Sequence, residues 1–115
     1  MEYQGLDQAV LRVLTQYKGR EHAVSRTDLV FKLRSYDLHE RQVRELIKEL
    51  RRSGHLIGSA PGYDGGYYMI QSAEEFQDFM TMEYQAKIND MRVTAQAMTK
   101  QANRVWGNAL QPKLF

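Results

Sequence analysis

The sequence predicts a mostly helical α+β chain, in which a small N-terminal domain is followed by one long helix. Three observations support this fold class. In residues 6–54, apolar side chains recur every three or four positions, as on one face of a helix. Two short β-prone runs then flank a loop rich in glycine and proline. Finally, residues 67–106 contain neither glycine nor proline, so nothing in that stretch predicts a break in a helix.

Composition limits the kinds of function. The 115 residues suffice for one domain with an appended element, and the formal net charge is only +2, so a nucleic-acid partner must be argued from local charge. No cysteine is present, which excludes disulfides and thiolate metal sites and is compatible with a reducing compartment. The chain has no apolar run of about 20 residues and no secretion signal at its start. We therefore expect a cytoplasmic protein that does not span a membrane.

The first two helices are predicted from periodicity and capping residues. Apolar residues at helical spacing indicate a first helix that stops near Gly19; they are Leu6, Ala9, Val10, Val13, Leu14 and Tyr17. The following pair Ala23-Val24 is long enough only for a minimal edge strand. Either Ser25 or Thr27 can then cap a second, short helix, which carries Leu29, Val30 and Leu33.

A third helix, from about His39 to Arg52, is apolar on one side and basic on the other. Its apolar residues occur at i, i+3, i+4 and i+7, and they are Val43, Leu46, Ile47 and Leu50. Its cations share an arc roughly opposite that face, and they are Arg41, Arg44, Lys48, Arg51 and Arg52. Asp37 is a better candidate for its N-cap than His39, and Gly54 ends the helix.

The two β-prone runs are 55–59 and 66–70, and the turn-rich loop between them ends in the pair Asp64-Gly65. Such a pattern predicts a β-hairpin. Helix, short strand, helix, helix and hairpin is the element order of a winged helix-turn-helix domain, with this two-stranded hairpin as the wing. We place that domain at residues 1–71.

A long C-terminal helix is predicted for residues 72–107. Ser72 and Glu75 form a capping box at its start, and a continuous helix from Ala73 to Trp106 would be about 50 Å long, against about 30 Å for a small domain. A heptad seam follows, made of Tyr84, Ile88, Met91, Ala95, Met98, Ala102 and Val105. The helix therefore breaks, folds back over the first helix, or pairs with another chain; we expect a modestly stable homodimer. The tail 108–115 ends in Leu114-Phe115, which can dock locally or on a partner.

The chain also resembles a known group of proteins. It is similar to small winged-helix proteins common in bacteriophages and prophages, notably of Gram-positive bacteria, and to the winged-helix modules of some bacterial repressors. The resemblance covers Leu6 to Phe79 and rests on Glu21-His22-Ala23-Val24-Ser25, then Arg41-x-Val43-Arg44-x-x-Ile47-x-x-Leu50-Arg51-x-x-Gly54-x-x-Ile57, then Gly66-Tyr67-Tyr68. It implies binding of double-stranded DNA through the third helix, with Arg41 and Arg44 facing the groove. The wing departs from the pattern, since it contains Asp64 and no Lys or Arg from Leu56 to Gln71.

No pattern typical of catalysis or of a metal or cofactor site is apparent. His22, His39 and His55 lack a second histidine at i+4, and the glycine-rich segment 62–66 lacks the Lys-Ser/Thr pair of a phosphate loop. The acidic residues near the start of the last helix, Glu74, Glu75 and Asp78, are explained by the helix dipole. We expect a protein that is not an enzyme and that needs neither a cofactor nor a metal.

The resulting hypothesis is a sequence-specific DNA-binding homodimer, a phage or prophage transcriptional regulator. Arg41 and Arg44 would reach base edges, and Glu45 would accept a hydrogen bond from cytosine. The remaining predicted contacts are to phosphates, from Lys48, Arg51 and Arg52 on the third helix and from Arg26 and Lys32 around the second.

The sequence is also compatible with three alternatives for the basic arc and the fold. The basic arc can be an ordinary solvated face with ion pairs such as Glu40–Arg44 and Glu45–Lys48. The fold can bind DNA for phage replication or packaging. It can also be a protein-interaction module that inhibits a host or defence complex.

Overall fold

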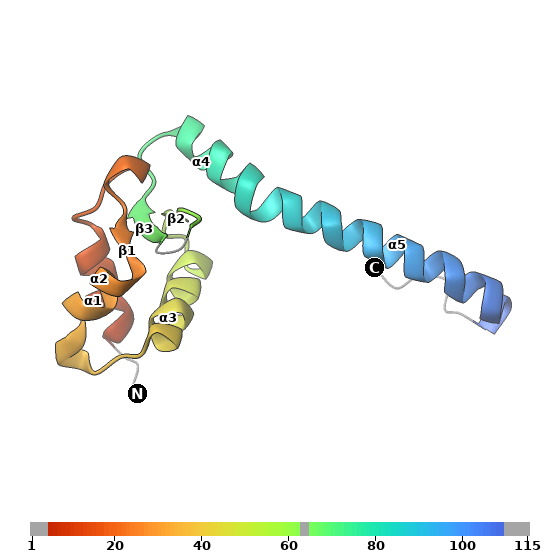
Figure 1. Ribbon diagram of the computed structural model, residues 1–115, viewed down its shortest axis with the longest axis horizontal. Helices are drawn as coiled ribbons and strands as arrows, with labels where there is room; N and C mark the ends of the chain where they lie inside the picture. The colour runs from red at the N-terminus through yellow and green to blue at the C-terminus, as the bar shows by residue number, and fades with distance from the viewer. Residues whose placement is uncertain (1–4, 63–64, 110–115) are drawn as a thin grey trace. The chain divides into compact units, whose positions relative to one another are not determined.

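The structure is a computed structural model, and it describes residues 5–62 and 65–109 (Figure 1). The chain divides into an N-terminal unit, residues 1–79, and a C-terminal unit, residues 80–115. The N-terminal unit contains α1 (Leu6–Leu14), η1 (Arg20–His22), β1 (Val24–Ser25), α2 (Arg26–Lys32), η2 (Arg34–Tyr36), α3 (Glu40–Arg52), β2 (Ile57–Ser59), β3 (Gly66–Met69) and α4 (Ala73–Phe79). The C-terminal unit contains η3 (Met80–Gln85), α5 (Ala86–Trp106) and η4 (Gly107–Ala109). The predicted α+β class is confirmed. Tyr63 and Asp64 of the predicted wing and residues 110–115 of the predicted tail lie outside the described residues.

Among residues 5–62 and 65–109, the three strands form one antiparallel sheet with β3 in the centre, in the order β1-β3-β2. The hairpin pairs Ile57 with Met69 and Ser59 with Tyr67. On its other side β3 pairs Tyr67 with Val24 of β1. The predicted hairpin and the predicted minimal strand at Val24 therefore join into a three-stranded sheet.

The core of the N-terminal unit lies between α1, α2, α3 and this sheet, which Figure 1 shows grouped together. All four residues of the apolar face predicted for the third helix are buried, since Val43, Leu46, Ile47 and Leu50 are at most 5% exposed. From the other elements the core receives, among others, Val10, Leu14, Leu29, Leu33 and Ile57, each at most 1% exposed. The periodicity argument for these helices is confirmed.

The first helix ends earlier than predicted, at Leu14 instead of near Gly19. Beyond it the chain is held by β3: the Met69 N–H donates to the Tyr17 carbonyl at 2.8 Å, and the Gly19 N–H donates to the Met69 carbonyl at 2.9 Å. Gly19 has a φ of 87°, a left-handed conformation that glycine adopts readily. Tyr17 thus leaves the helix because its backbone pairs with a strand that is distant in sequence.

Two helix caps were ambiguous in the sequence. Ser25 caps α2, since its Oγ accepts from the Asp28 N–H at 3.1 Å. Asp37 does not cap α3, because it adopts a left-handed conformation with a φ of 56° at the end of η2. His39 precedes α3, and its N–H donates to the side chain of Gln42 at 2.8 Å. The preference for Asp37 was therefore wrong.

Glu75 links the start of α4 to a distant part of the chain. The Glu75 N–H donates to Ser72 Oγ at 3.0 Å, which is one half of the predicted capping box. Its carboxylate, however, accepts from the Gln71 N–H at 2.7 Å and from the Arg20 N–H at 2.9 Å. In this way α4 is fastened to η1, and Phe79 at its end is buried in the N-terminal unit.

Tyr68 is the largest fully buried side chain of the sheet, and it is 1% exposed. Its ring occupies the space that a side chain at position 58 would need, so Gly58 is required for its placement. Burial raises the pKa of the Tyr68 hydroxyl above the ordinary value of a tyrosine. The phenol therefore remains neutral at physiological pH, and its role is packing.

The helix predicted for residues 72–107 is assigned as α4, η3 and α5 in succession. The segment η3 is a π-helix, a form in which hydrogen bonds join residues five apart. Tyr84, the first residue of the predicted heptad seam, lies in η3, and the other six lie on α5. No residue of α5 is buried, and no helix in the described part of the chain is long and apolar enough to cross a membrane.

Candidate nucleic-acid interface

Burial of one face of α3 determines which of its side chains reach solvent. With the apolar face in the core, helix geometry directs Arg41, Lys48 and Arg52 away from the domain. All three are exposed, and within the described residues none of them forms an ion pair. They are therefore available to a negatively charged partner.

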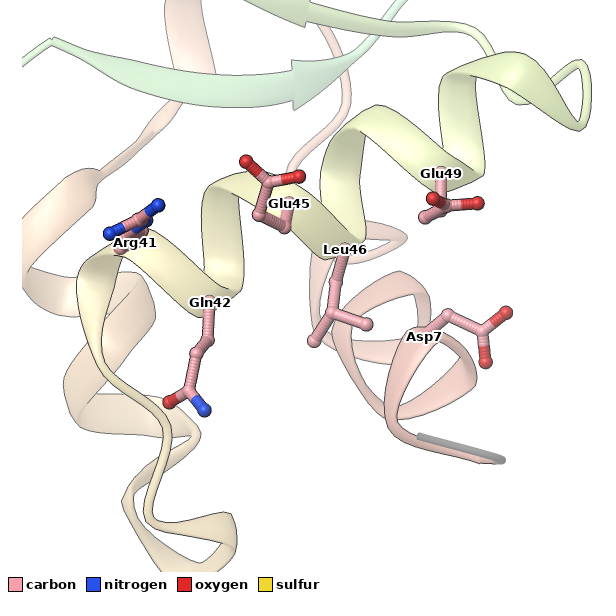
Figure 2. Close-up of a pocket in the computed structure, with 6 residues that line it drawn as sticks. All are labelled: Asp7, Arg41, Gln42, Glu45, Leu46 and Glu49. Atoms are coloured by element: carbon pink, nitrogen blue, oxygen red, sulfur yellow. The ribbon is translucent and has the colours of Figure 1, made fainter. Parts of the chain in front are cut away.

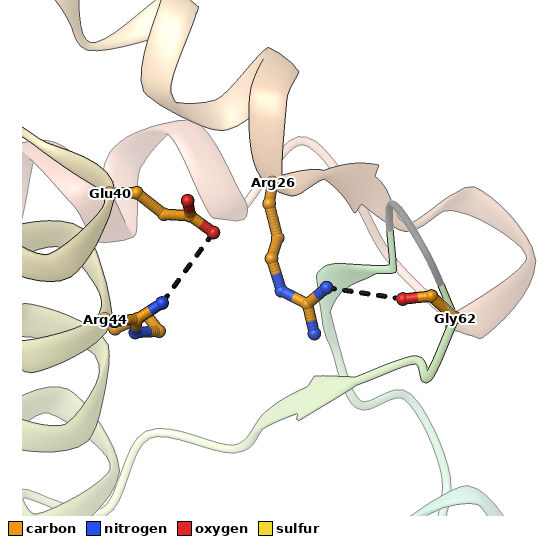
Figure 3. Close-up of polar contacts among 4 residues, drawn as sticks. All are labelled: Arg26, Glu40, Arg44 and Gly62. Atoms are coloured by element: carbon orange, nitrogen blue, oxygen red, sulfur yellow. Dashed lines mark hydrogen bonds and ion pairs between the residues drawn. The ribbon is translucent and has the colours of Figure 1, made fainter.

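Arg44 lies beside this group and forms an ion pair within its own helix (Figure 3). Its Nη1 is 3.8 Å from Glu40 Oε2, and the two side chains are 54% and 53% exposed. Exposed pairs of this kind contribute about 0–1 kcal/mol. An approaching phosphate or base can therefore take Arg44 from Glu40 at little cost. The ion pair that sequence spacing suggested between these residues is present.

Arg26 lies between α3 and the β2–β3 loop (Figure 3). Its Nη1 donates to the Gly62 carbonyl at 3.5 Å, and its own N–H donates to the Gly65 carbonyl at 3.2 Å. The side chain is half-buried. Arg26 thus ties the start of α2 to the hairpin loop and brings a cation to a loop that contains none of its own.

Arg51 differs from the other cations predicted on this helix, because it is engaged in the packing of the N-terminal unit. Its Nε donates to the Ile57 carbonyl of β2 at 2.8 Å, and its guanidinium carbon lies 5.2 Å from the centre of the Phe79 ring. The side chain is half-buried. Arg51 therefore joins α3 to β2 and α4, and we do not include it in the candidate interface.

We expect Arg51→Ala to lower the free energy of unfolding by about 1–3 kcal/mol, because a hydrogen bond from a charged group and its ring contact are lost. The neighbouring Arg52→Ala is the matched control, since Arg52 is exposed, and it should change stability by no more than about 0.5 kcal/mol. Urea denaturation followed by circular dichroism measures both. Equal stabilities of the two variants would contradict the packing role of Arg51.

The side of α3 that faces α1 is acidic (Figure 2). An open pocket there is lined by Asp7 of α1 and by Arg41, Gln42, Glu45, Leu46 and Glu49 of α3. Three of these six residues are carboxylates and one is a cation. The structure therefore places Glu45 at the boundary between the basic surface and an acidic flank. The contribution of Asp7 comes from another helix, and sequence periodicity within α3 could not reveal it.

Lys32, predicted to contact phosphate from the second helix, lies beside Tyr17. Its Nζ lies 6.0 Å from the centre of the Tyr17 ring, beyond the end of α1. Gln42, which periodicity did not single out, is half-buried at the start of α3, and its side chain accepts a hydrogen bond from the His39 N–H. Its side chain fixes the first turn from which Arg41 and Arg44 extend. The capping signal Gln at N3 was present in the sequence, although His is an unusual residue before it.

We define the basic surface as Arg41, Arg44, Lys48 and Arg52 of α3, with Arg26 beside it. In the parts of the chain that the structure describes, no group of three or more His, Asp or Glu side chains has an arrangement that could hold a metal ion.

No protein-family model matches the chain, and comparisons with curated proteins and with solved structures give no significant match.

Proposed function

We propose that this chain is a winged helix-turn-helix protein that binds specific sequences of double-stranded DNA as a homodimer. We further propose that it acts as a phage or prophage transcriptional regulator, as its resemblance to phage winged-helix proteins implies. The observation that carries the proposal is α3, whose apolar face is fixed in the core while its exposed cations form the basic surface. A helix presented in this way is what the DNA major groove accepts.

The surroundings of α3 support the same function. The element order, with two helices before α3 and a hairpin after it, is that of a winged helix-turn-helix domain. Arg26, from the start of α2, lies between α3 and the hairpin loop. In the proposed complex Arg41 and Arg44 read bases near the start of α3, and Lys48, Arg52 and Arg26 contact phosphates. Arginine is suited to base reading because its guanidinium can donate two hydrogen bonds to guanine.

The direct test is selection of bound sequences from a random pool of double-stranded DNA at physiological salt. Enrichment of one motif is expected, and a palindromic motif would agree with a homodimer. An enriched motif that is not associated with a promoter would favour a role in replication or packaging. Absence of any enrichment would overturn the proposal.

We expect Arg41→Ala to weaken binding to the selected site by about 1–3 kcal/mol and to relax its sequence preference, because a base contact is lost. Lys48→Ala should instead weaken binding to all DNA sequences alike and reduce the salt dependence by about one unit of slope. Fluorescence anisotropy at several salt concentrations measures both effects. Arg12→Ala is the control, since Arg12 is exposed on α1. If Arg12→Ala weakens binding as much as Arg41→Ala, the assigned interface is wrong.

One observation favours a second function, the inhibition of a host or defence complex through protein contacts. The hairpin from Leu56 to Gln71 contains no Lys or Arg, and Asp7, Glu45 and Glu49 form an acidic flank beside the basic surface. Carboxylates at such a position repel phosphates, whereas a protein partner can match mixed charge. A chain that enriches no DNA sequence and whose binding to DNA is lost at physiological salt would favour this alternative.

A further inference from the structure

The apolar seam of α5 is exposed, except at Ala102, which is half-buried. Ile88, Met91, Met98 and Val105 are between 51% and 70% exposed, and they share one face of the helix with Ala95 and Ala102. We propose that this face binds α5 of a second copy in the antiparallel direction. The inference rests on the homodimer of the proposed function and adds to it the orientation of the two chains.

Side-chain size is the first argument for this orientation. In a parallel pair, equivalent residues face each other, so Met91 meets Met91 of the partner subunit and Ala95 meets Ala95 of the partner subunit. Wide and narrow layers then alternate, and the two helices cannot keep one spacing. In an antiparallel pair, each of the two methionines faces an alanine, so large side chains meet small ones in those layers, as in a well-packed core. The layers are then Ile88 with Val105 of the partner subunit, Met91 with Ala102 of the partner subunit, and Ala95 with Met98 of the partner subunit.

The surface of α5 beside Ala95 agrees with this arrangement. A shallow, mostly apolar groove runs along the helix there, and Met91, Ala95 and Thr99 contribute to its lining. The small side chain of Ala95 leaves room in this groove for a long, flexible side chain. Met98 of the partner subunit faces Ala95 in the antiparallel register, and methionine is well suited to fill an irregular space.

Charge beside the seam is the second argument. In a parallel pair, residues on the two sides of the seam meet five positions apart, which places Lys87 next to Arg92 of the partner subunit, and symmetry repeats this contact. Lys87 Nζ is paired with the carboxylate of Glu83 of η3 at 3.1 Å, whereas Arg92 donates to the neutral side chain of Asn89. In the antiparallel register, Arg92 instead faces Thr99 of the partner subunit. The like-charge contact is thereby removed.

The two orientations differ in where the N-terminal units are attached. α5 has 21 residues, so in an antiparallel pair the two Ala86 residues lie at opposite ends, about 30 Å apart along the helices. In a parallel pair they would lie side by side. Disulfide crosslinks between single introduced cysteines can distinguish these arrangements. No other crosslink can form, because the natural chain contains no cysteine.

The experiment mixes equal amounts of Ile88→Cys and Val105→Cys chains, tagged to differ in size, and oxidises them without DNA. The expected product is the mixed crosslink between positions 88 and 105. Val93→Cys, whose position is 64% exposed but off the seam, is the control and should not crosslink to either chain. Helical content by circular dichroism checks that every variant folds.

Each other outcome overturns the inference. Crosslinks between two copies of the same variant, 88 with 88 and 105 with 105, would show a parallel pair. A wild-type chain that sediments as a monomer at tens of micromolar would show that the face does not pair. DNA selection with the wild-type chain is scored separately, so enrichment together with a parallel crosslink overturns the orientation alone. An antiparallel crosslink without enrichment overturns DNA binding alone.

Discussion

Gly66→Ala is expected to leave the N-terminal unit unfolded in most molecules at room temperature. Gly66 begins β3 and lies opposite Ser25 of β1. A Cβ at this position would overlap the carbonyl oxygen of Val24 and would lie 2.6 Å from its carbonyl carbon. Both are backbone atoms, so no side-chain rotation relieves the overlap, and β1 must separate from β3. We expect a loss above about 4 kcal/mol, which is comparable to the whole stability of a small domain.

Gly62→Ala is the matched control, because it makes the same substitution in the same hairpin. Gly62 has a φ of +121°, but among the described residues a Cβ there meets no atom within 4 Å. Its cost should therefore be limited to conformational strain, about 1–2 kcal/mol. Thermal and urea unfolding by far-ultraviolet circular dichroism measures both variants. Unfolding of the two at the same urea concentration would contradict the close approach of β1 and β3.

The parts of the fold that follow from local pattern could be predicted from the sequence. The face of α3 that periodicity assigned to the core is buried in full, and both strands of the hairpin lie within the β-prone runs. The end of α1 could not be predicted in the same way. Tyr17 is apolar and correctly spaced for a longer helix, but its carbonyl accepts from Met69, which is 52 residues later in the chain. Local periodicity contains no information about such a contact.

The candidate interface shows the same division. Helix geometry identified the basic side of α3, and Arg41, Lys48 and Arg52 are exposed there. The same geometry could not separate Arg44 from Arg51, because both lie at the edge of that side. Only the positions of β2 and α4 determine that Arg51 bonds Ile57 and contacts Phe79, whereas Arg44 remains exposed.

The acidic flank and the π-helical segment were not predicted for related reasons. Asp7 meets the surface of Glu45 and Glu49 only because α1 packs against α3. The π-helical hydrogen bonds of η3 have no signature in a stretch of ordinary helix-forming residues. The heptad spacing predicts that Tyr84 and Ile88 lie on the same face of one α-helix. In the structure Tyr84 lies in the π-helical segment η3, whereas Ile88 lies on the α-helix α5.

The proposed homodimer gives the second large expectation: Ile88→Glu combined with Met98→Glu should convert the dimer into a monomer. Each glutamate would be buried in the seam without a partner, at a cost of several kcal/mol, which exceeds what a short seam containing alanine can supply. Both positions are more than half exposed within the chain, so the unfolding of the N-terminal unit should not change.

Sedimentation velocity at tens of micromolar measures this conversion, and the control is Val93→Glu, which adds a charge to an equally exposed apolar position off the seam. Val93→Glu should remain dimeric. A double variant that stays dimeric would place the contact elsewhere than on α5.

If the chain binds DNA as a dimer, the monomeric variant should also lose affinity for a two-part site, because each copy then binds without the local concentration supplied by the other. Its affinity for a single half-site should be unchanged, since α3 is intact in the monomer. The comparison of the two sites therefore separates a loss of pairing from damage to the DNA-binding surface.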